Sequence, residues 1–141
     1  MYASMTTLPK QRRQTEAPPD DDHEFSIVLR EPERLIGYIC LPDPSYADRK
    51  AALSICIGEE ADRGKGYGAE AIRLLLDYAF NTLRLHNIQL YLNGDNARAL
   101  ACYKKVGFKE FGRRRESKFH GGRYVDEIYM DILDGEFAAG M

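Results

Sequence analysis

Residues 63–68 read RGKGYG, and a helical pattern follows them directly. Glycine weakens a helix and loosens the backbone, so three glycines in six positions need a structural or functional reason. Glycines let backbone N–H groups approach a ligand closely, and a helix N-terminus adds partial positive charge. The segment therefore predicts an anion-binding site, and a glycine-rich loop with only a structural role is the alternative.

Two better-known phosphate-binding motifs do not fit this segment. A P-loop needs G-x-x-x-x-G-K-[ST], but Lys65 is followed by a glycine and a tyrosine, so no hydroxyl can reach a magnesium ion. The dinucleotide fingerprint G-x-G-x-x-[GA] is met literally from Gly64 to Ala69, yet six residues separate the preceding apolar run from Gly64. The fingerprint needs a tight turn there, and its acidic ribose ligand would come about ten residues too late, at Asp95. A nucleotide-binding α/β domain is therefore the weakest interpretation.

The composition describes one globular domain. The chain has 141 residues, of which 44% are hydrophobic and 30% are charged, a balance that is typical of folded proteins. A net charge of −2 gives no general attraction to nucleic acid or to an anionic membrane. No apolar run approaches the roughly 20 residues of a membrane span, and the N-terminus lacks the apolar core of a signal peptide. These features predict a cytoplasmic protein with neither a nucleic-acid nor a membrane partner.

Metal and disulfide chemistry find little support in the sequence. The three cysteines are an odd number and are widely spaced. They are typical of a reducing compartment and of small buried side chains rather than of disulfides. The three histidines show no metal-ligand spacing, so we expect no metal site.

Hydrophobic periodicity predicts six strands and two helices. The expected strands are 25–30, 35–41, 51–58, 87–92, 108–115 and 123–133, and the expected helices are 66–83 and 97–106. The first two strands would form a hairpin, and the nearly all-apolar strand 51–58 would lie centrally in its sheet. Asn96 is a favourable N-cap for the second helix, and Gly107 marks its end. The order of elements is β-β-β-α-β-α-β-β.

The domain boundaries follow from the same pattern. Residues 1–24 are polar, with three prolines and the acidic stretch DDDHE, and predict an arm outside the fold. Residues 25–133 hold every periodic segment and form the single expected domain, and residues 134–141 form a C-terminal tail. Strand 25–30 would then leave a sheet edge or face poorly covered. We expect either a homodimer or the arm itself to cover that surface.

Three separate motifs resemble the GNAT superfamily of N-acetyltransferases. The segment RGKGYG at 63–68 resembles the family's R/Q-x-x-G-x-[GA] loop, and residues 51–80 resemble its central strand, loop and long helix. Residues 93–116 resemble the next signature, an Asn before a short helix and then Tyr and Gly-Phe. Residues 118–133 resemble the closing strand of the branch that acetylates ribosomal-protein N-termini. The resemblance covers residues 25–133 and implies an α/β (α+β) fold with a mixed, mostly antiparallel sheet, a central splayed strand pair and flanking helices.

The resemblance also implies which residues would serve acetyl transfer from acetyl-CoA to an amine. The loop 63–68 would cradle the pyrophosphate through backbone N–H groups, and strand backbone near Cys56 would face the pantetheine arm. Asn96 would bond the cofactor, Arg98 would contact a phosphate, and Tyr103 would protonate the departing thiolate. The implied cofactor-binding set is Ile55, Cys56, Ile57, Arg63, Gly64, Lys65, Gly66, Tyr67, Gly68, Asn96 and Arg98, with Tyr103 as the catalytic residue.

Each of these roles has a simpler alternative. Asn96 can serve only as a helix cap, and Tyr103 can serve only by packing its ring against the sheet. Arg98 is typical of a solvated helix residue. Cys56 is typical of a small core residue rather than a nucleophile, because the sequence places no activating histidine near it.

The chain departs from the family's pattern in two places. Where the ribosomal-protein branch usually has a glutamate as general base, this sequence has Ala52. Asp43, Asp48 and Glu127 are the remaining candidates for a base, with bulk water as the alternative. The family also begins with a strand and two helices that shape the acceptor site, and residues 1–24 are too short and polar to supply them. The sequence thus predicts an N-acetyltransferase for a primary amine, either a protein N-terminus or a small amine, with a non-catalytic acyl-CoA-binding module as the alternative.

Overall fold

A computed structural model of the chain describes residues 3–7, 23–30, 33–58 and 62–140. Their strands are β1 (Ala3–Thr7), β2 (His23–Arg30), β3 (Glu33–Leu41), β4 (Lys50–Ala52), β5 (Ser54–Ile57), β6 (Asn87–Asn93), β7 (Lys109–His120) and β8 (Arg123–Leu133). Their helices are α1 (Tyr67–Asp77), which continues into a π-helical turn (Tyr78–Thr82), α2 (Ala97–Val106) and α3 (Asp134–Ala139).

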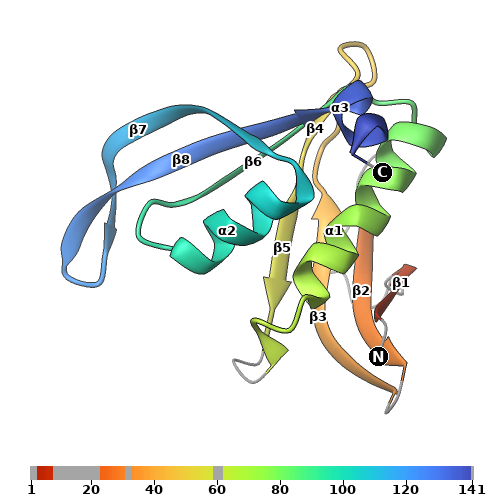
Figure 1. The fold of residues 1–141 in the computed structure, drawn as a ribbon, viewed down its shortest axis with the longest axis horizontal. Helices are drawn as coiled ribbons and strands as arrows, with labels where there is room; N and C mark the ends of the chain where they lie inside the picture. Colours follow the sequence, from red (N-terminus) through yellow and green to blue (C-terminus); the bar gives the residue numbers. More distant parts are fainter. Residues whose placement is uncertain (1–2, 8–22, 31–32, 59–61, 141) are drawn as a thin grey trace.

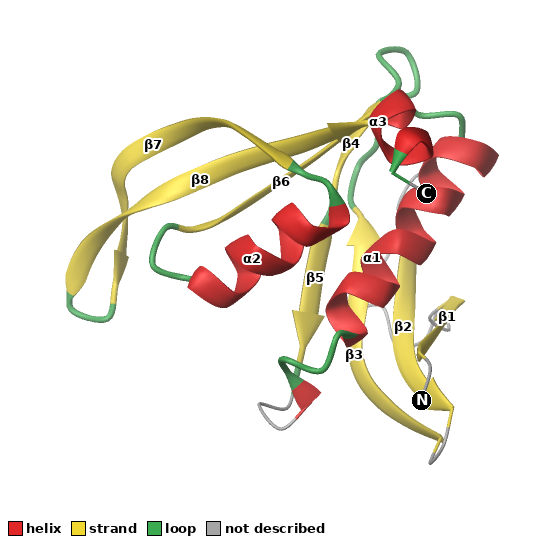
Figure 2. Ribbon diagram, in the orientation of Figure 1, coloured by secondary structure: helices red, strands yellow, loops and turns green. Residues whose placement is uncertain are grey.

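The strands form two sheets that are mostly antiparallel (Figure 1). The first has the order β1-β2-β3-β5, and the second has the order β4-β6-β8-β7. The pairing of β4 with β6 is parallel, and all other pairings are antiparallel. Helix α1 lies over β2 and β3, and α2 lies where β5 and β6 diverge (Figure 2). The predicted fold class and the predicted β2–β3 hairpin are confirmed.

The expected single strand at 51–58 is wrong, because this segment changes sheets at Leu53. Up to that residue the segment pairs with β6. The last hydrogen bond to β6 is donated by Leu53 N–H to the carbonyl oxygen of Gln89 at 2.8 Å. From Ser54 onward it pairs with β3 instead. Gly37 of β3 permits this close pairing, since a Cβ there would lie 2.1 Å from the carbonyl oxygen of Cys56. β4 and β5 are therefore edge strands rather than central ones, and the sheet opens between β5 and β6.

The N-terminal segment also differs from its prediction. Residues 3–7, expected to belong to a polar arm, form strand β1 and pair antiparallel with β2 from Ala3↔Leu29 to Thr7↔Phe25. One of the two predicted ways to cover the β2 edge is thus present in the structure. The last two residues of the predicted arm, His23 and Glu24, begin β2. The remaining arm residues, 1–2 and 8–22, lie outside the described residues.

The core lies between α1 and the two sheets. The inner face of α1 and its π-helical extension buries Ile72, Leu75, Leu76, Ala79 and Phe80, which recur at helical spacing. They pack in one cluster with Ile27, Ile39 and Leu41 of the first sheet and with Ile88, Met130 and Ile132 of the second. Burial of each Ile, Leu, Phe or Met side chain of the cluster stabilises the fold by about 1.5–3 kcal/mol, so this cluster fixes α1 on the sheets.

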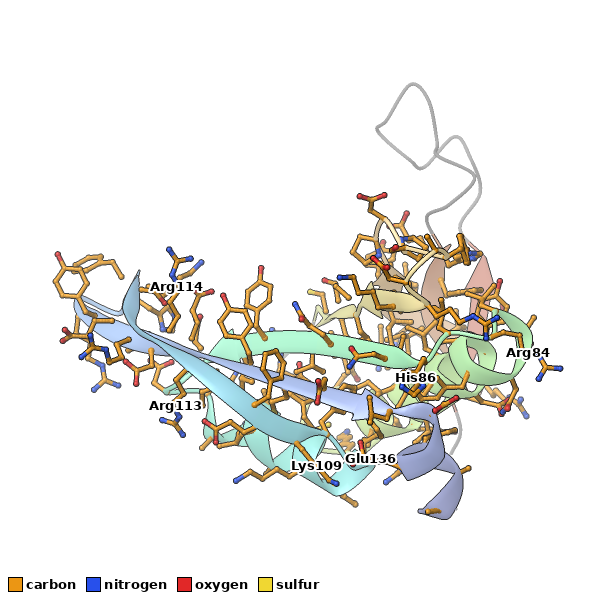
Figure 3. The ribbon with its side chains drawn as sticks, turned by 90° about the horizontal axis from the view of Figure 1, so that it is seen from above. Arg84, His86, Lys109, Arg113, Arg114 and Glu136 are labelled. Carbon is orange, nitrogen blue, oxygen red and sulfur yellow. The ribbon has the colours of Figure 1, made fainter. Side chains whose placement is uncertain are left out.

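The final strand pair forms a long hairpin that projects from the body of the molecule (Figure 1). Its turn is Gly121–Gly122, and both glycines have positive φ, 62° and 78°, as a two-residue hairpin turn requires. The register shifts between Arg114 and Lys118, where β7 bulges. Arg113 and Arg114 point to opposite sides of the hairpin (Figure 3). Residues 113–115, three consecutive arginines, thus form a solvent-exposed part of β7.

The expected C-terminal tail is helix α3, which packs back onto the second sheet. Phe137 is buried and its ring lies against Phe80, at 5.6 Å between centroids. Glu136 pairs with Lys109 of β7, and the two side chains meet in Figure 3. In the part of the chain that the structure describes, no helix has both the length and the apolar character that crossing a membrane requires.

Candidate active site

A pocket of about 780 Å³ lies between β5, the loop before α1, the first turn of α1 and one side of α2. Ten of the twelve residues that the sequence predicted as site residues line it: Ile55, Cys56, Ile57, Arg63, Gly64, Gly66, Gly68, Asn96, Arg98 and Tyr103. Lys65 and Tyr67 do not. Lys65 is exposed, and Tyr67 is half-buried and packs against the core cluster.

One wall of the pocket is the backbone of β5. This strand pairs with β3 along one side, from Gly37↔Ile57 to Cys40↔Ser54. Its other side has no strand partner among the described residues, because β6 has already diverged. An edge strand presents N–H and C=O groups that have no neighbouring strand to pair with. An extended ligand that carries amide groups can therefore pair with β5 as an additional strand would.

The glycine loop forms the end wall of the pocket. Gly64 and Gly66 have φ values of 76° and 86°, which residues with a Cβ rarely adopt. A Cβ on either residue would meet nothing within 4 Å, so backbone conformation and not crowding by the protein requires glycine here. Gly68 lies deeper, because a Cβ there would contact Ile57 Cδ1 at 3.8 Å and Cys102 Sγ at 3.9 Å.

The first turn of α1 is left open to a ligand. Gly66 is its N-cap and has no side chain to accept a hydrogen bond from the turn. The first backbone N–H groups of a helix have no intrahelical partner, and the helix dipole concentrates positive charge there. The pocket therefore has a set of N–H donors at the end where the sequence predicted an anion.

Arg63 is partly engaged by the protein itself. Its Nε and Nη2 atoms donate to the carbonyl oxygen of Ile57 at 3.2 and 3.1 Å. These bonds hold the start of the loop against the end of β5. The guanidinium remains exposed at the rim of the pocket, where it adds positive charge close to the N–H donors of α1.

Helix α2 begins at the opposite side of the pocket. Its bounds, Ala97–Val106, are those that the sequence predicted. Asn96 accepts a hydrogen bond from the N–H of Ala99 at 3.1 Å, so its predicted capping role is confirmed. The cap uses the amide oxygen, which leaves the NH₂ group of Asn96 available to a ligand. Arg98 lines the pocket close to the start of the helix and is exposed.

Tyr103 lies on α2 two turns after Asn96, and both residues line the pocket, as their spacing predicts. The ring is half-buried and lies 6.1 Å from the ring of Phe108. Burial, together with the neighbouring Cys102, raises the pKa of the Tyr103 phenol to about 12. The phenol therefore keeps its proton throughout the neutral pH range and can serve as a hydrogen-bond donor.

The pocket contains no predicted general base. Asp43, Asp48 and Glu127 are absent from its lining. Glu127 lies on β8 and accepts a hydrogen bond from Ser117 at 2.9 Å, and Asp48 is exposed beside Ser45. Ala52 ends β4 just before the sheet opens.

Sequence reasoning missed two aspartates and a cysteine of the pocket. Asp62 precedes Arg63 and is buried, Asp95 precedes Asn96, and Cys102 is half-buried beside Gly68. Burial raises the pKa of the Cys102 thiol, so this residue is held in its neutral form. For the two aspartates the only available signal was their position directly before each predicted binding motif.

The open first turn of α1, the free edge of β5 and the splay beside it are typical of an acyltransferase fold with room for a nucleotide-linked thioester. Residues 4–109 match the family model described as an acetyltransferase (GNAT) domain. The chain therefore belongs to this family, whose members transfer acyl groups from acetyl-CoA to amines.

Individual relatives extend this likeness. The spermidine N(1)-acetyltransferase of Vibrio cholerae is 36% identical over 118 residues, which are 83% of this chain and 68% of that protein. The putative ribosomal N-acetyltransferase YdaF of Bacillus subtilis is 31% identical, over 73% of this chain and 56% of that protein. The crystal structure of the V. cholerae enzyme in complex with CoA and spermine matches with a TM-score of 0.77 and 33% identity, over 84% of this chain and 69% of that one.

These relatives confirm the family that the sequence predicted but not the branch within it. The GNAT resemblance is confirmed, but the relatives include spermidine acetyltransferases as well as a ribosomal-type protein, so the chain is not assigned to the ribosomal-protein branch. The chain also spans only 56% to 69% of the lengths of the three proteins just named.

Proposed function

We propose that this chain transfers the acetyl group of acetyl-CoA to a primary amine of a small polyamine. The observation that carries the proposal is the open first turn of α1, with its two left-handed glycines, facing the free edge of β5 across one pocket. A diphosphate and an amide-bearing arm would each find the donors they need in that space.

The residues of the pocket fit acetyl-CoA in three places. The N–H groups of the α1 first turn and the exposed Arg63 would hold the diphosphate. The free edge of β5 at Ile55–Ile57 would pair with the amides of the pantetheine arm. The side-chain NH₂ group of Asn96 and the guanidinium of Arg98 would add polar contacts from α2.

Acetyl-CoA would supply a thioester whose carbonyl carbon is attacked by the amine and whose thiolate then departs. A backbone N–H on the free edge of β5 would stabilise the negative charge that develops on the carbonyl oxygen. Tyr103 would donate a hydrogen bond from its neutral phenol to the departing sulfur. A free thiol has a pKa of about 8.5, well below the value of about 12 for Tyr103, so the phenol would polarise the thiolate rather than give up its proton.

The amine must lose a proton, and the carboxylates that line the pocket are already engaged by cationic or histidine partners. Asp62 is tied to Arg34, and Asp95 is tied to His120. We propose that water takes this proton. Activity should then rise with pH as the fraction of neutral amine rises, and the midpoint of the rise should follow the pKa of the amine rather than that of an enzyme group.

The choice of a polyamine over a protein N-terminus rests on the relatives. The V. cholerae spermidine acetyltransferase has the higher identity, 36% against 31% for the ribosomal-type protein, and a larger part of its length is matched. Of the two acceptors that the sequence left open, a small amine is therefore better supported than a protein N-terminus. The expected homodimer stays a prediction.

The proposal is tested by two measurements on the full chain. Calorimetry with CoA, with NAD and ATP as competitors, measures binding, and a thiol-release assay with acetyl-CoA measures turnover. The acceptor panel is spermidine, spermine, a simple monoamine and a peptide with a free N-terminus. We expect CoA binding and faster turnover with the polyamines. CoA binding without turnover on any amine would favour the non-catalytic module, and binding of NAD or ATP in place of CoA would refute the proposal.

A further inference from the structure

Asp62 is the one charged residue that is buried among the residues the structure describes. Its side chain is 4% exposed, and both carboxylate oxygens accept hydrogen bonds from Arg34. Arg34 Nη1 donates to Oδ2 at 2.9 Å, and Arg34 Nη2 donates to Oδ1 at 2.7 Å. Such a two-bond arrangement fixes the relative orientation of the two groups as well as their distance.

A buried carboxylate is unexpected at this position. Asp62 lines the pocket directly before the residues that would hold a diphosphate, and an unpaired negative charge there would repel that ligand. Arg34 removes this conflict by neutralising the carboxylate. The hydrogen bonds of Arg34 hold the pKa of Asp62 below its usual value, and the charge of Lys65 adds to the effect.

The pair also ties the glycine loop to the sheet. Arg34 lies near the start of β3, the strand that pairs with β5 through Gly37↔Ile57. The next loop residue, Arg63, is bonded to the carbonyl of Ile57 at the end of β5. Two successive loop residues are thus fastened to two neighbouring strands, and the left-handed Gly64 and Gly66 follow immediately.

We propose that Asp62 and Arg34 are positioning residues that hold the loop 62–66 so that the N–H groups of the α1 first turn face the diphosphate of acetyl-CoA. In this arrangement Asp62 acts on binding through the loop, and Arg34 both anchors it and cancels its charge. The inference rests on the proposed function, because it concerns the same pocket.

The test compares two acetyl donors. Acetyl-CoA has the diphosphate, whereas acetyl-pantetheine has the reactive arm without it. The variants are Asp62→Asn, Arg34→Gln and the double variant, and the matched control is Glu136→Gln, which breaks a carboxylate–cation pair far along the chain on α3. Circular dichroism and thermal melting establish that each variant is folded, and Arg34→Lys serves as the conservative substitution.

We expect Arg34→Gln to raise the KM for acetyl-CoA the most, by more than roughly 10-fold, because it leaves an uncompensated carboxylate beside the diphosphate. Asp62→Asn should raise it by roughly 10-fold, since it loses a charge-assisted anchor without leaving a repulsive charge. The double variant should bind acetyl-CoA more tightly than Arg34→Gln alone. With acetyl-pantetheine, all variants should match the wild type within about twofold, as should Glu136→Gln with both donors.

Equal losses with both donors would overturn the inference, because they would assign the pair a general structural or a chemical role. A double variant no better than Arg34→Gln would also overturn it. If the wild type turns over neither donor, the proposed function fails, and calorimetry with CoA and pantetheine then decides the positioning role separately. Wild-type CoA affinity in folded Asp62→Asn and Arg34→Gln would exclude it.

Discussion

The two helices that border the pocket begin in opposite ways. Helix α1 starts at Gly66, which is left-handed and has no side chain to cap the first turn. Helix α2 starts at Asn96, whose side chain accepts a hydrogen bond from Ala99 N–H. A helix that caps itself satisfies one of its own donors, whereas one that starts at glycine leaves its donors to a ligand. The difference supports the proposal that α1 binds the anion and that α2 holds Tyr103.

The loops before the two helices are anchored by the same chemistry at different depths. Asp62, before α1, is bound by Arg34 with its side chain 4% exposed. Asp95, before α2, is bound by His120 at 3.0 Å and faces Arg123 at 3.6 Å, with its side chain 21% exposed. A charge pair gains strength as it leaves water, so the α1 loop should depend more on its anchor than the α2 loop does.

The largest effect is expected at the start of α1, where the first turn has no side-chain cap. Gly66→Val places a β-branched side chain at a φ of 86° and in the space before the first turn. We expect CoA affinity to fall by roughly 100-fold or more, as for the loss of two charge-assisted hydrogen bonds, measured by calorimetry.

The matched control for Gly66→Val is Gly122→Val in the β7–β8 turn. Gly122 also has a positive φ, 78°, and a Cβ there would likewise meet nothing within 4 Å, but this residue lies outside the pocket. Both variants should lose stability from backbone strain, and only Gly66→Val should lose CoA affinity. Normal CoA affinity in a folded Gly66→Val would exclude the α1 first turn as the diphosphate site.

The next largest effect, on turnover, is expected at Tyr103 of α2. Tyr103→Phe keeps the ring beside Phe108 and removes only the hydroxyl. We expect turnover to fall by roughly 100-fold, the usual worth of a positioned hydrogen-bond donor to developing negative charge, with CoA affinity nearly unchanged. Tyr91→Phe, an exposed position on β6 outside the pocket, is the control. A decrease of less than about threefold would make Tyr103 a packing residue.

Local signals account for the parts of the site that the sequence predicted. The loop 63–68 and the segment 96–107 each have their decisive residues within one short stretch, so the glycines, the Asn96 cap and the helix end were readable together. Both stretches line the same pocket in the structure. The core face of α1 was equally readable, because it depends on a 3.6-residue period alone.

The parts that were missed depend on residues far apart in the chain. The break at Leu53 occurs inside an apolar run without glycine or proline, and it follows from pairing with β3 through Gly37. The burial of Asp62 could not be predicted from its local sequence, because its partner Arg34 is 28 positions away. The raised pKa of Tyr103 could not be read from the sequence for the same reason, since its burial arises only when α2 packs.

A smaller effect is expected at the cap of α2. Asn96→Ala removes the acceptor for Ala99 N–H and should lower the free energy of unfolding by about 1 kcal/mol, the usual worth of an N-cap. Asn96→Asp keeps the cap but replaces the side-chain NH₂ group with an anionic oxygen. If Asn96 also binds CoA, Asn96→Asp should be stable yet weak in CoA affinity, as melting curves and calorimetry together would show. Wild-type CoA affinity in Asn96→Asp would leave Asn96 with the capping role alone.

The smallest effect is expected at Asp95, the shallower of the two anchors. The hydrogen bond from His120 holds the pKa of the Asp95 carboxyl below its usual value, and Arg123 contributes in the same direction. A carboxyl whose pKa is lower in the folded state stabilises the fold at pH values above its unfolded pKa of about 4. That contribution is lost as the pH falls through the folded value. The wild type should therefore lose slightly more stability than Asp95→Asn between about pH 5 and about pH 2, measured by denaturant unfolding.

Because Asp95 is partly exposed, the stability curves of the wild type and Asp95→Asn should also approach each other in high salt, whereas the effect of Asp62→Asn should persist. Equal salt sensitivity at the two positions would contradict the difference in depth between the anchors.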